Sequence, residues 1–278
     1  MSNNQNKPGV VVSLFRYPVK SMMGEELNVT EIGDRGLVGD RAYAIVDSSD
    51  GKVGSAKNPR KWPDLFDFRA TYIEPPHIGM KMPTVRITLP DGTIVINKQD
   101  DVDYILSEAL HRKVALEAAS GVAEKVLANA EEYWPDMEEL EYRNEVTHFT
   151  LPEGTFFDCA LVHLLTTATL DRLSELYPQG RFETRRFRPN LVIQPGTDEK
   201  GFVENNWVGH TLLIGHEVRL NITASCARCV MTTLSQGDLP KDLGILRTAA
   251  QNNKANVGVY ATVVHGGTIH RGDAVWLE

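Results

Sequence analysis

Short apolar runs separated by turn residues dominate the first 120 residues and predict β-strands. Three such runs are Val10–Phe15, Arg41–Asp47 and Phe68–Glu74. Two further runs, Thr84–Leu89 and Thr93–Asn97, flank Pro90-Asp91-Gly92. This arrangement predicts a β-hairpin, because Asp-Gly tolerates the positive φ of a tight turn. The segment Asp101–His111 instead has apolar residues at helical spacing behind an aspartate, which predicts a helix capped by Asp101.

The second half of the chain repeats this mixture of short strands and few helices. A helix is expected over Thr169–Tyr177, ended by Pro178, and a second over Leu239–Ala250. The expected strands are Asn190–Gln194, Thr211–Ile214, Glu217–Thr223, Cys229–Leu234, Val259–Val264 and Ala274–Leu277. Many short strands with few helices favour a mainly β fold, a barrel or closed sandwich, over a doubly wound sheet.

An acidic segment divides the chain. Between Glu124 and Glu145 there are eight acidic residues and two basic ones, so most of the net charge of −8 lies there. Such a run is usually a solvated connector or helix face, and the alternative is a docking surface for a basic partner. We therefore expect a β-rich domain over residues 1–120, an acidic connector over 121–147, and a β-barrel domain over 148–278.

Composition narrows the class of protein. With 42% hydrophobic and 24% charged residues, the 278-residue chain reads as an ordinary soluble globular protein. No run approaches the roughly 20 apolar residues of a membrane-spanning helix, and the polar start is not a secretory signal. Three cysteines make a disulfide scaffold implausible, so a cytoplasmic location is expected. A pI near 5.5 argues against nucleic acid as the main partner.

Cys226-Ala227-Arg228-Cys229 is the first candidate for chemistry. Four interpretations are open. The motif could belong to a zinc site, although the sequence has no second such cysteine pair, or be a redox dithiol, which is disfavoured because a strand is expected next. It could also be two buried small residues without chemistry, or supply a thiolate ligand to a soft or high-valent metal. Arg228 would favour a thiolate beside it.

Cations gather in loops next to the predicted strands. They occur in Lys20-Ser21, Asp40-Arg41, Ser55–Arg60 and Arg185–Asn190. A single basic loop residue is usually only solvated, but several at strand ends in a net-acidic protein favour a pocket for an anion. Thr166, Thr167 and Thr169 begin a predicted helix, whose amides could accept a phosphate, although ordinary capping explains them as well.

Motifs of several large enzyme classes are absent from the sequence. It contains no GxGxxG, GxxxxGK[ST], HExxH or GxSxG, so dinucleotide, P-loop, zincin and serine-hydrolase functions lose their usual support.

At the candidate residues the sequence resembles the MOSC family, named after the C-terminal domain of eukaryotic molybdenum cofactor sulfurases. It most resembles the branch of the mitochondrial amidoxime-reducing component and its bacterial relatives. The resemblance covers almost the whole chain. Its signatures are Tyr17-Pro18-Val19-Lys20-Ser21 with Gly24, Asp40-Arg41, Phe187-Arg188-Pro189-Asn190, Cys226-x-Arg228-Cys229 with Thr232-Thr233, and Gly267-Thr268-Ile269 with Gly272-Asp273.

The resemblance implies a MOSC-type β-barrel core, a β-rich MOSC N-terminal domain, and the molybdenum cofactor (Mo-molybdopterin) held by one thiolate. Motif alignment makes Cys229 that metal ligand and leaves Cys226 without a role. The residues implied to bind the cofactor are Lys20, Ser21, Arg41, Arg188, Thr166, Thr169, Asn190, Arg228 and Tyr260. A pyridoxal phosphate assignment of such domains also stays open.

The implied activity is reduction of N-hydroxylated compounds, with N–O or S–O bonds, by oxygen-atom removal. Three cysteines cannot hold both an iron–sulfur cluster and molybdenum. The expected electron source is therefore a separate protein: a ferredoxin, a flavodoxin or a cytochrome b5-like protein with its reductase. The alternative is a protein that binds the cofactor, or carries its sulfur, without turnover.

Overall fold

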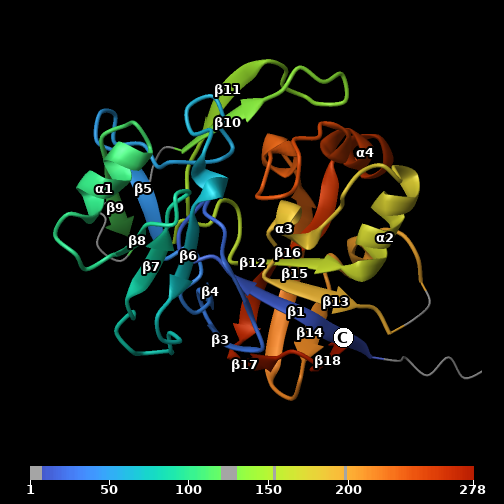
Figure 1. Cartoon of the computed structure of the whole chain (residues 1–278). Helices are drawn as coiled ribbons and strands as arrows, with labels where there is room; N and C mark the ends of the chain where they lie inside the picture. Colours follow the sequence, from blue (N-terminus) through green and yellow to red (C-terminus); the bar gives the residue numbers. More distant parts are fainter. Residues whose placement is uncertain (1–7, 120–129, 153–154, 197–198) are drawn as a thin grey trace, which may run out of the picture.

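The computed structural model describes residues 8–119, 130–152, 155–196 and 199–278 (Figure 1). The expected fold class is confirmed, since the chain is mainly β with a few helices. Within the described ranges, no helix has both the length and the apolar character needed to cross a membrane.

A closed seven-stranded barrel forms the larger part of the molecule. Around the barrel the strands are β13 (Leu191–Gln194), β12 (Val162–Thr166), β16 (Asn256–His265), β15 (Val218–Ala227), β14 (Thr211–Ile214), β18 (Ala274–Leu277) and β1 (Gly9–Arg16), and β1 pairs again with β13. Short β2 (Glu25–Leu27) pairs with β1 on the outside of this ring. Side chains from all seven strands, among them Leu164, Leu220 and Val259, fill the interior.

A bulge in β1 explains which of its residues face the core. Val11 pairs with Ile193 and Ser13 with Val192, so one extra residue of β1 is inserted opposite β13. Side chains of a strand alternate between the core and the outside, and the inserted residue shifts this alternation by one position. The core-facing side chain is therefore Val11 before the bulge and Leu14 after it.

The N-terminal lobe has a separate hydrophobic core. Its strands are β5 (Tyr43–Asp47), which pairs with β9 (Val114–Ala118), and the meander β6 (Arg69–Tyr72), β7 (Val85–Thr88) and β8 (Ile94–Ile96). The β7–β8 pair is the predicted hairpin, and Asp91 closes its turn by accepting a hydrogen bond from the Thr93 amide. Helix α1 (Val102–Ala109) is also confirmed, but the Asp101 carboxylate accepts from Gln99 and does not cap the helix.

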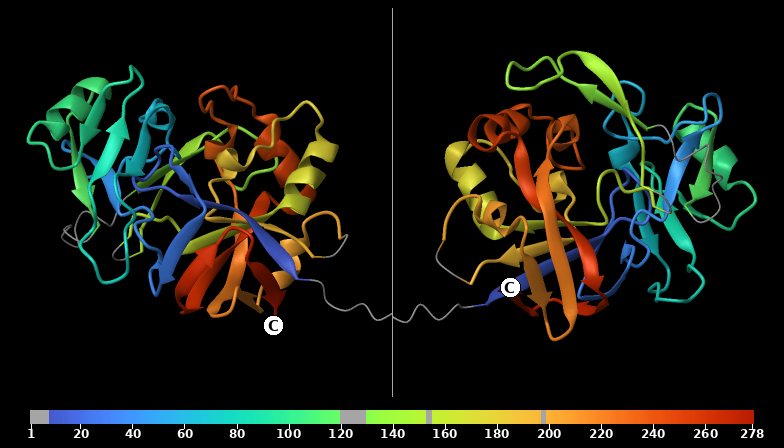
Figure 2. Two further views of the ribbon diagram at one scale, coloured as in Figure 1. Left: turned by 60° about the horizontal axis from the view of Figure 1, so that its bottom comes forward. Right: turned by 180° about the vertical axis from the view of Figure 1, so that it is seen from behind.

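Segments from the two ends of the chain share sheets. β1 lies near the N-terminus yet closes the C-terminal barrel, whereas β17 (Gly267–His270) joins β3 (Val29–Gly33) and β4 (Gly36–Leu37) in a small sheet. Figure 2 shows the blue β1 running through the red and orange strands of the barrel. The positions of loops from both halves are therefore fixed by shared sheets.

Helices α2 (Thr167–Leu176), α3 (Thr184–Phe187) and α4 (Gly244–Asn253) lie together at one end of the barrel (Figure 1). They share a small core that includes Leu173, Phe187 and Ile245. The helix predicted over Leu239–Ala250 is α4, which begins five residues later than predicted, at Gly244. The Asp242 carboxylate accepts a hydrogen bond from the Gly244 amide, and the chain before it makes a turn closed by Gln236 and Leu239.

The acidic segment is a β-hairpin in its described part, so the helix face considered for it is not found there. β10 (Ala130–Trp134) pairs with β11 (Glu145–Phe149), while Glu124 and Lys125 lie outside the described residues. The tip of the hairpin buries Met137 and Leu140 against α4 (Figure 2). The hairpin therefore links the N-terminal lobe to the barrel end of the molecule.

The strand expected over Cys229–Leu234 is a 3₁₀ helix over Val230–Thr233, so that prediction was wrong. Two side chains explain the difference. The Thr232 hydroxyl donates to the Cys229 carbonyl and the Thr233 hydroxyl to the Val230 carbonyl, which satisfies the backbone locally without a partner strand. The expected strand was also the reason to disfavour a redox dithiol at Cys226 and Cys229, so that reason no longer holds.

Candidate functional site

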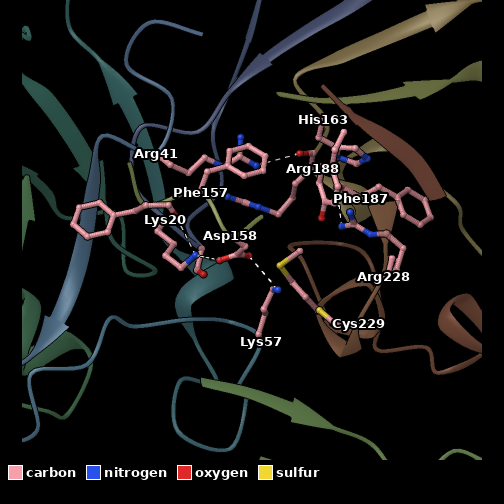
Figure 3. A pocket seen from close by; sticks show the side chains of 15 residues that line it. Lys20, Arg41, Lys57, Phe157, Asp158, His163, Phe187, Arg188, Arg228 and Cys229 are labelled. Carbon is pink, nitrogen blue, oxygen red and sulfur yellow. Dashed lines mark hydrogen bonds and ion pairs between the residues drawn. The ribbon is translucent and has the colours of Figure 1, made fainter. Parts of the chain in front are cut away.

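A polar pocket lies where the loops of both lobes meet (Figure 3). Its described lining residues are Lys20, Ser21, Arg41, Lys57, Phe156, Phe157, Asp158, His163, Phe187, Arg188, Ala227, Arg228, Cys229, Met231 and Tyr260. Five of these side chains are Lys or Arg, and Asp158 is the one carboxylate among them. The pocket therefore carries a surplus of positive charge, as the spread of cations in the sequence predicts.

Three of the lining residues have a left-handed backbone. Ser21 has φ 63°, Arg41 has φ 46° and Arg188 has φ 52°. Residues with a side chain rarely adopt this region, and such strain gathers at functional sites where the surrounding structure imposes it.

Aromatic rings hold the two guanidinium groups of Arg41 and Arg188 side by side. The Arg41 guanidinium carbon lies 4.3 Å from the ring centroids of both Tyr17 and Phe157, and that of Arg188 lies 4.1 Å from the Tyr17 centroid. Arg41 also donates to the Arg188 carbonyl at 3.2 Å. Burial, together with the Arg41 charge, lowers the pKa of Arg188 to about 10. Arg41 is also paired with the Asp40 carboxylate, so the charge of Arg188 is the less compensated of the two.

Lys20, Lys57 and Asp158 form a buried ion network. The Lys20 ammonium donates to the Phe156 carbonyl at 2.9 Å and to the Asp158 carboxylate, which also lies 3.4 Å from Lys57. Burial lowers the pKa of Lys20. Burial alone would raise the pKa of Asp158, but the two ammonium groups hold it well below its usual value. One carboxylate is therefore shared between two cations.

The two sulfurs of the Cys226–Cys229 motif occupy different environments. Cys229 lines the pocket, and burial and the nearby Glu132 raise the pKa of its thiol to about 12. Cys226 is fully buried and is not among the lining residues. Burial there is outweighed by Arg228 and His163, which lower the pKa of Cys226.

Most of the residues that the sequence predicts for the site are brought together. Lys20, Ser21, Arg41, Arg188, Arg228, Cys229 and Tyr260 all line the pocket. This proximity joins motifs from both lobes that lie far apart in the chain. Their predicted roles in binding a cofactor stay predictions.

Thr166, Thr169 and Asn190 do not line the pocket. The Thr166 hydroxyl accepts from the Thr169 amide, and both hydroxyls donate to the buried Glu204 carboxylate. The Asn190 side chain accepts from the His163 amide and donates to the Phe15 carbonyl. Thr166 therefore caps α2, Thr169 lies in its first turn, and Asn190 links strands of the barrel.

Three polar lining residues, Lys57, Asp158 and His163, were not among the predicted site residues. Lys57 lies in the basic loop Ser55–Arg60 that the sequence singled out, so its charge gave a partial signal. Asp158 and His163 gave none, because their importance depends on Lys20 and Cys226, far away in the chain.

The alternative of a zinc site gains no support from the described residues. Among them, no three His, Cys, Asp or Glu side chains gather closely enough to hold a metal ion. All three cysteines are free thiols in this structure.

Comparison with known proteins gives two family matches. A model described as the MOSC domain matches residues 152–276, and one described as the MOSC N-terminal beta barrel domain matches residues 8–128. The first segment holds Arg188 and Cys229, and the second holds Lys20 and Arg41. The pocket therefore draws on both matched segments.

Curated relatives are distant. The chain is 26% identical over 238 residues to mitochondrial amidoxime reducing component 2 of Rattus norvegicus, over 81% of this chain and 67% of that protein. It is 22% identical over 273 residues to the molybdenum cofactor sulfurase of Homo sapiens, over 91% of this chain and 30% of that protein. Among solved structures, the YUAD protein from Bacillus subtilis aligns with 98% of this chain and 97% of its own, at a TM-score of 0.49 and 9% identity.

Proposed function

Since the chain belongs to the MOSC family, with a MOSC N-terminal beta barrel domain ahead of its MOSC domain, we propose that it is a molybdenum-cofactor-dependent oxidoreductase. Its substrates would be small N-hydroxylated compounds, or others with N–O or S–O bonds, reduced by removal of the oxygen atom. The amidoxime-reducing component among the relatives supports this choice of reaction.

The observation that carries the proposal is one cysteine, Cys229, that lines the pocket together with five cationic side chains. Two buried guanidinium nitrogens at this pocket, Nη2 of Arg188 and Nε of Arg228, have no hydrogen-bond partner within the described parts of the chain. Such groups are costly to bury unpaired and favour a ligand with acceptor oxygens. A soft thiolate for a metal and cations for a phosphate are what a phosphorylated dithiolene chelate of molybdenum requires.

In this proposal Cys229 supplies the metal ligand, while Lys20, Ser21, Arg41, Arg188 and Arg228 bind the pterin and its phosphate. The bound cofactor would supply the two-electron redox chemistry that amino-acid side chains lack. Because burial raises the pKa of the Cys229 thiol, a metal that binds there would have to displace the thiol proton.

The remaining side chains position and shield the site. Asp158 holds Lys20 and Lys57 in place, and Tyr17 and Phe157 keep water away from the faces of Arg41. The electrons would come from a separate electron-transfer protein such as a ferredoxin, a flavodoxin or a cytochrome b5-like protein.

The first prediction concerns metal content. Protein produced in a host that makes the cofactor should contain molybdenum and pterin, and Cys229→Ala should lose nearly all of the molybdenum because the anchoring thiolate is gone. Elemental analysis of purified protein measures both. Cys159→Ala is the matched control, since this exposed thiol is not a lining residue, and it should keep its metal. Wild-type protein without molybdenum, or Cys229→Ala that retains it, contradicts the proposal.

The second candidate is a protein that binds the cofactor or carries its sulfur without turnover. The alignment with a molybdenum cofactor sulfurase, which covers 91% of this chain at 22% identity, favours this candidate. Benzamidoxime with an artificial reductant separates the two candidates. Turnover by the molybdenum-loaded protein supports the reductase, whereas bound molybdenum without any turnover supports the carrier.

A further inference from the structure

Cys226 is a buried sulfur for which the proposed function has no use. It is the last residue but one of β15, three residues before Cys229, is fully buried, and is not among the residues that line the pocket. A metal ligand must reach the ligand space, so this position does not suit Cys226 to that role. Its contacts are directed at protein groups.

The shortest of these contacts joins Cys226 to Arg228. The Arg228 Nη1 donates to the Cys226 sulfur at 2.7 Å, and Nη2 donates to the Phe187 carbonyl at 2.9 Å. Two of the three guanidinium nitrogens are thus fixed, from two different elements. Nε is left buried without a partner in the described structure, although Arg228 lines the pocket.

Two neighbouring strands complete the surroundings of the sulfur. His163 on β12 and Tyr260 on β16 lie beside Cys226, with their ring centroids 5.9 Å apart, and Cys159 is a further titratable group close to Tyr260. A glycine makes this possible. Gly258 has φ 85°, and a Cβ there would lie 2.4 Å from Nε2 of His163. The charged and titratable groups that face Cys226 are therefore Arg228, His163 and Tyr260, and the guanidinium and imidazole groups lower its pKa.

We propose that Cys226 is a positioning residue, whose thiolate acts as the counter-ion that orients the Arg228 guanidinium and leaves Nε to bind an anionic oxygen of the ligand. A charge-assisted contact from a planar guanidinium fixes direction as well as distance. The assignment holds for any anionic ligand of the pocket, so it stands or falls independently of the molybdenum chemistry.

In this assignment the two cysteines of the motif have different roles. Cys229 is the pocket-facing thiol, and Cys226 is a buried anion that never meets the ligand. Because Phe187 directly precedes Arg188, the same arrangement also ties the guanidinium of Arg228 to the backbone that presents the next arginine.

The first test asks which cysteine is ionised. The ultraviolet absorbance of thiolate is followed at neutral pH in cofactor-free protein and in three single variants, Cys226→Ser, Cys229→Ser and Cys159→Ser. We expect one thiolate in the wild type, unchanged in Cys229→Ser and Cys159→Ser and lost in Cys226→Ser. A wild type without thiolate, or a signal that disappears with Cys229, overturns the assignment without requiring Cys226→Ser to fold.

The second test asks whether the sulfur acts through Arg228. Calorimetric binding of inorganic phosphate to the cofactor-free protein should be weakened about tenfold in Cys226→Ser, because Arg228 loses its anionic partner. Cys226→Asp restores a negative charge at similar size and should recover most of the affinity. In an Arg228→Lys background, Cys226→Ser should change the affinity little. Equal affinity in wild type and Cys226→Ser, or the same loss in both backgrounds, overturns the proposal.

Discussion

At the scale of single residues, Asp158 is the side chain whose removal is most informative. Its carboxylate neutralises Lys20 and Lys57 at the point where an anionic ligand would meet them. We predict that Asp158→Asn binds inorganic phosphate about tenfold more tightly in the cofactor-free protein. The reason is that the carboxylate of Asp158 no longer repels the phosphate or competes with it for the two lysines. Calorimetry measures the change. Asp50→Asn, which removes a partner of Lys61 away from the pocket, should leave the affinity unchanged, and weaker binding by Asp158→Asn contradicts the prediction.

Single residues of the pocket were predictable when their own neighbours in the sequence carried the signal. Lys20, Arg41 and Arg188 each stand in a motif next to a predicted strand. The importance of Asp158 arises from Lys20, which is 138 positions away. The different ionisation of Cys226 and Cys229 depends on the folded positions of Arg228, His163 and Glu132, which no spacing within the motif reveals.

At the scale of elements, the buried junction between α2 and the 3₁₀ helix Val203–Trp207 gives a pH-dependent prediction. Burial raises the pKa of Glu204, whose carboxylate accepts from the caps of α2. The Glu204 carboxyl group therefore loses its proton at a lower pH in the unfolded chain than in the folded chain. As the pH rises through the interval between these two pKa values, ionisation of Glu204 lowers the free energy of unfolding. Glu204→Gln should therefore melt a few degrees higher than wild type at pH 8.

The advantage of Glu204→Gln should shrink toward pH 4, where the wild-type carboxyl is protonated in both states. Differential scanning calorimetry across this pH range measures the effect. Glu175→Gln, an exposed change on α2, serves as the control. A variant less stable than wild type at pH 8 contradicts the prediction.

Elements were predictable where apolar periodicity decided the structure. Six of the seven barrel strands, the β7–β8 hairpin and α2 were predicted in this way, whereas the barrel strand β12 was not predicted. The 3₁₀ helix after Cys229 was missed because two threonine hydroxyls overrule the strand preference of Val230–Thr233. The acidic hairpin was missed because only a few of its apolar residues are buried. Met137 and Leu140, which pack against α4, stand between charged residues in the sequence.

At the scale of the whole molecule, the uneven charge leads to a prediction about the electron donor. The acidic side chains of the β10–β11 hairpin that point outward are Asp136, Glu138, Glu139, Glu141 and Glu145. If the donor docks on this surface, added salt should raise the KM for the donor several-fold through screening. Steady-state kinetics with the donor test this, and the KM for a small neutral reductant should not change. A donor KM that is constant across ionic strength contradicts the prediction.

The place of β1 in the barrel has a consequence for how the chain is made. Apart from the short β2, the partners of β1 are β13 and β18, which begin at Leu191 and Ala274, so β1 leaves the ribosome long before its barrel pairings can form. Until then the barrel stays open and its unpaired strands are free to associate with other chains. A fragment beginning at residue 152 would keep this defect permanently, and we expect it to aggregate unless residues 9–16 are supplied as a separate peptide.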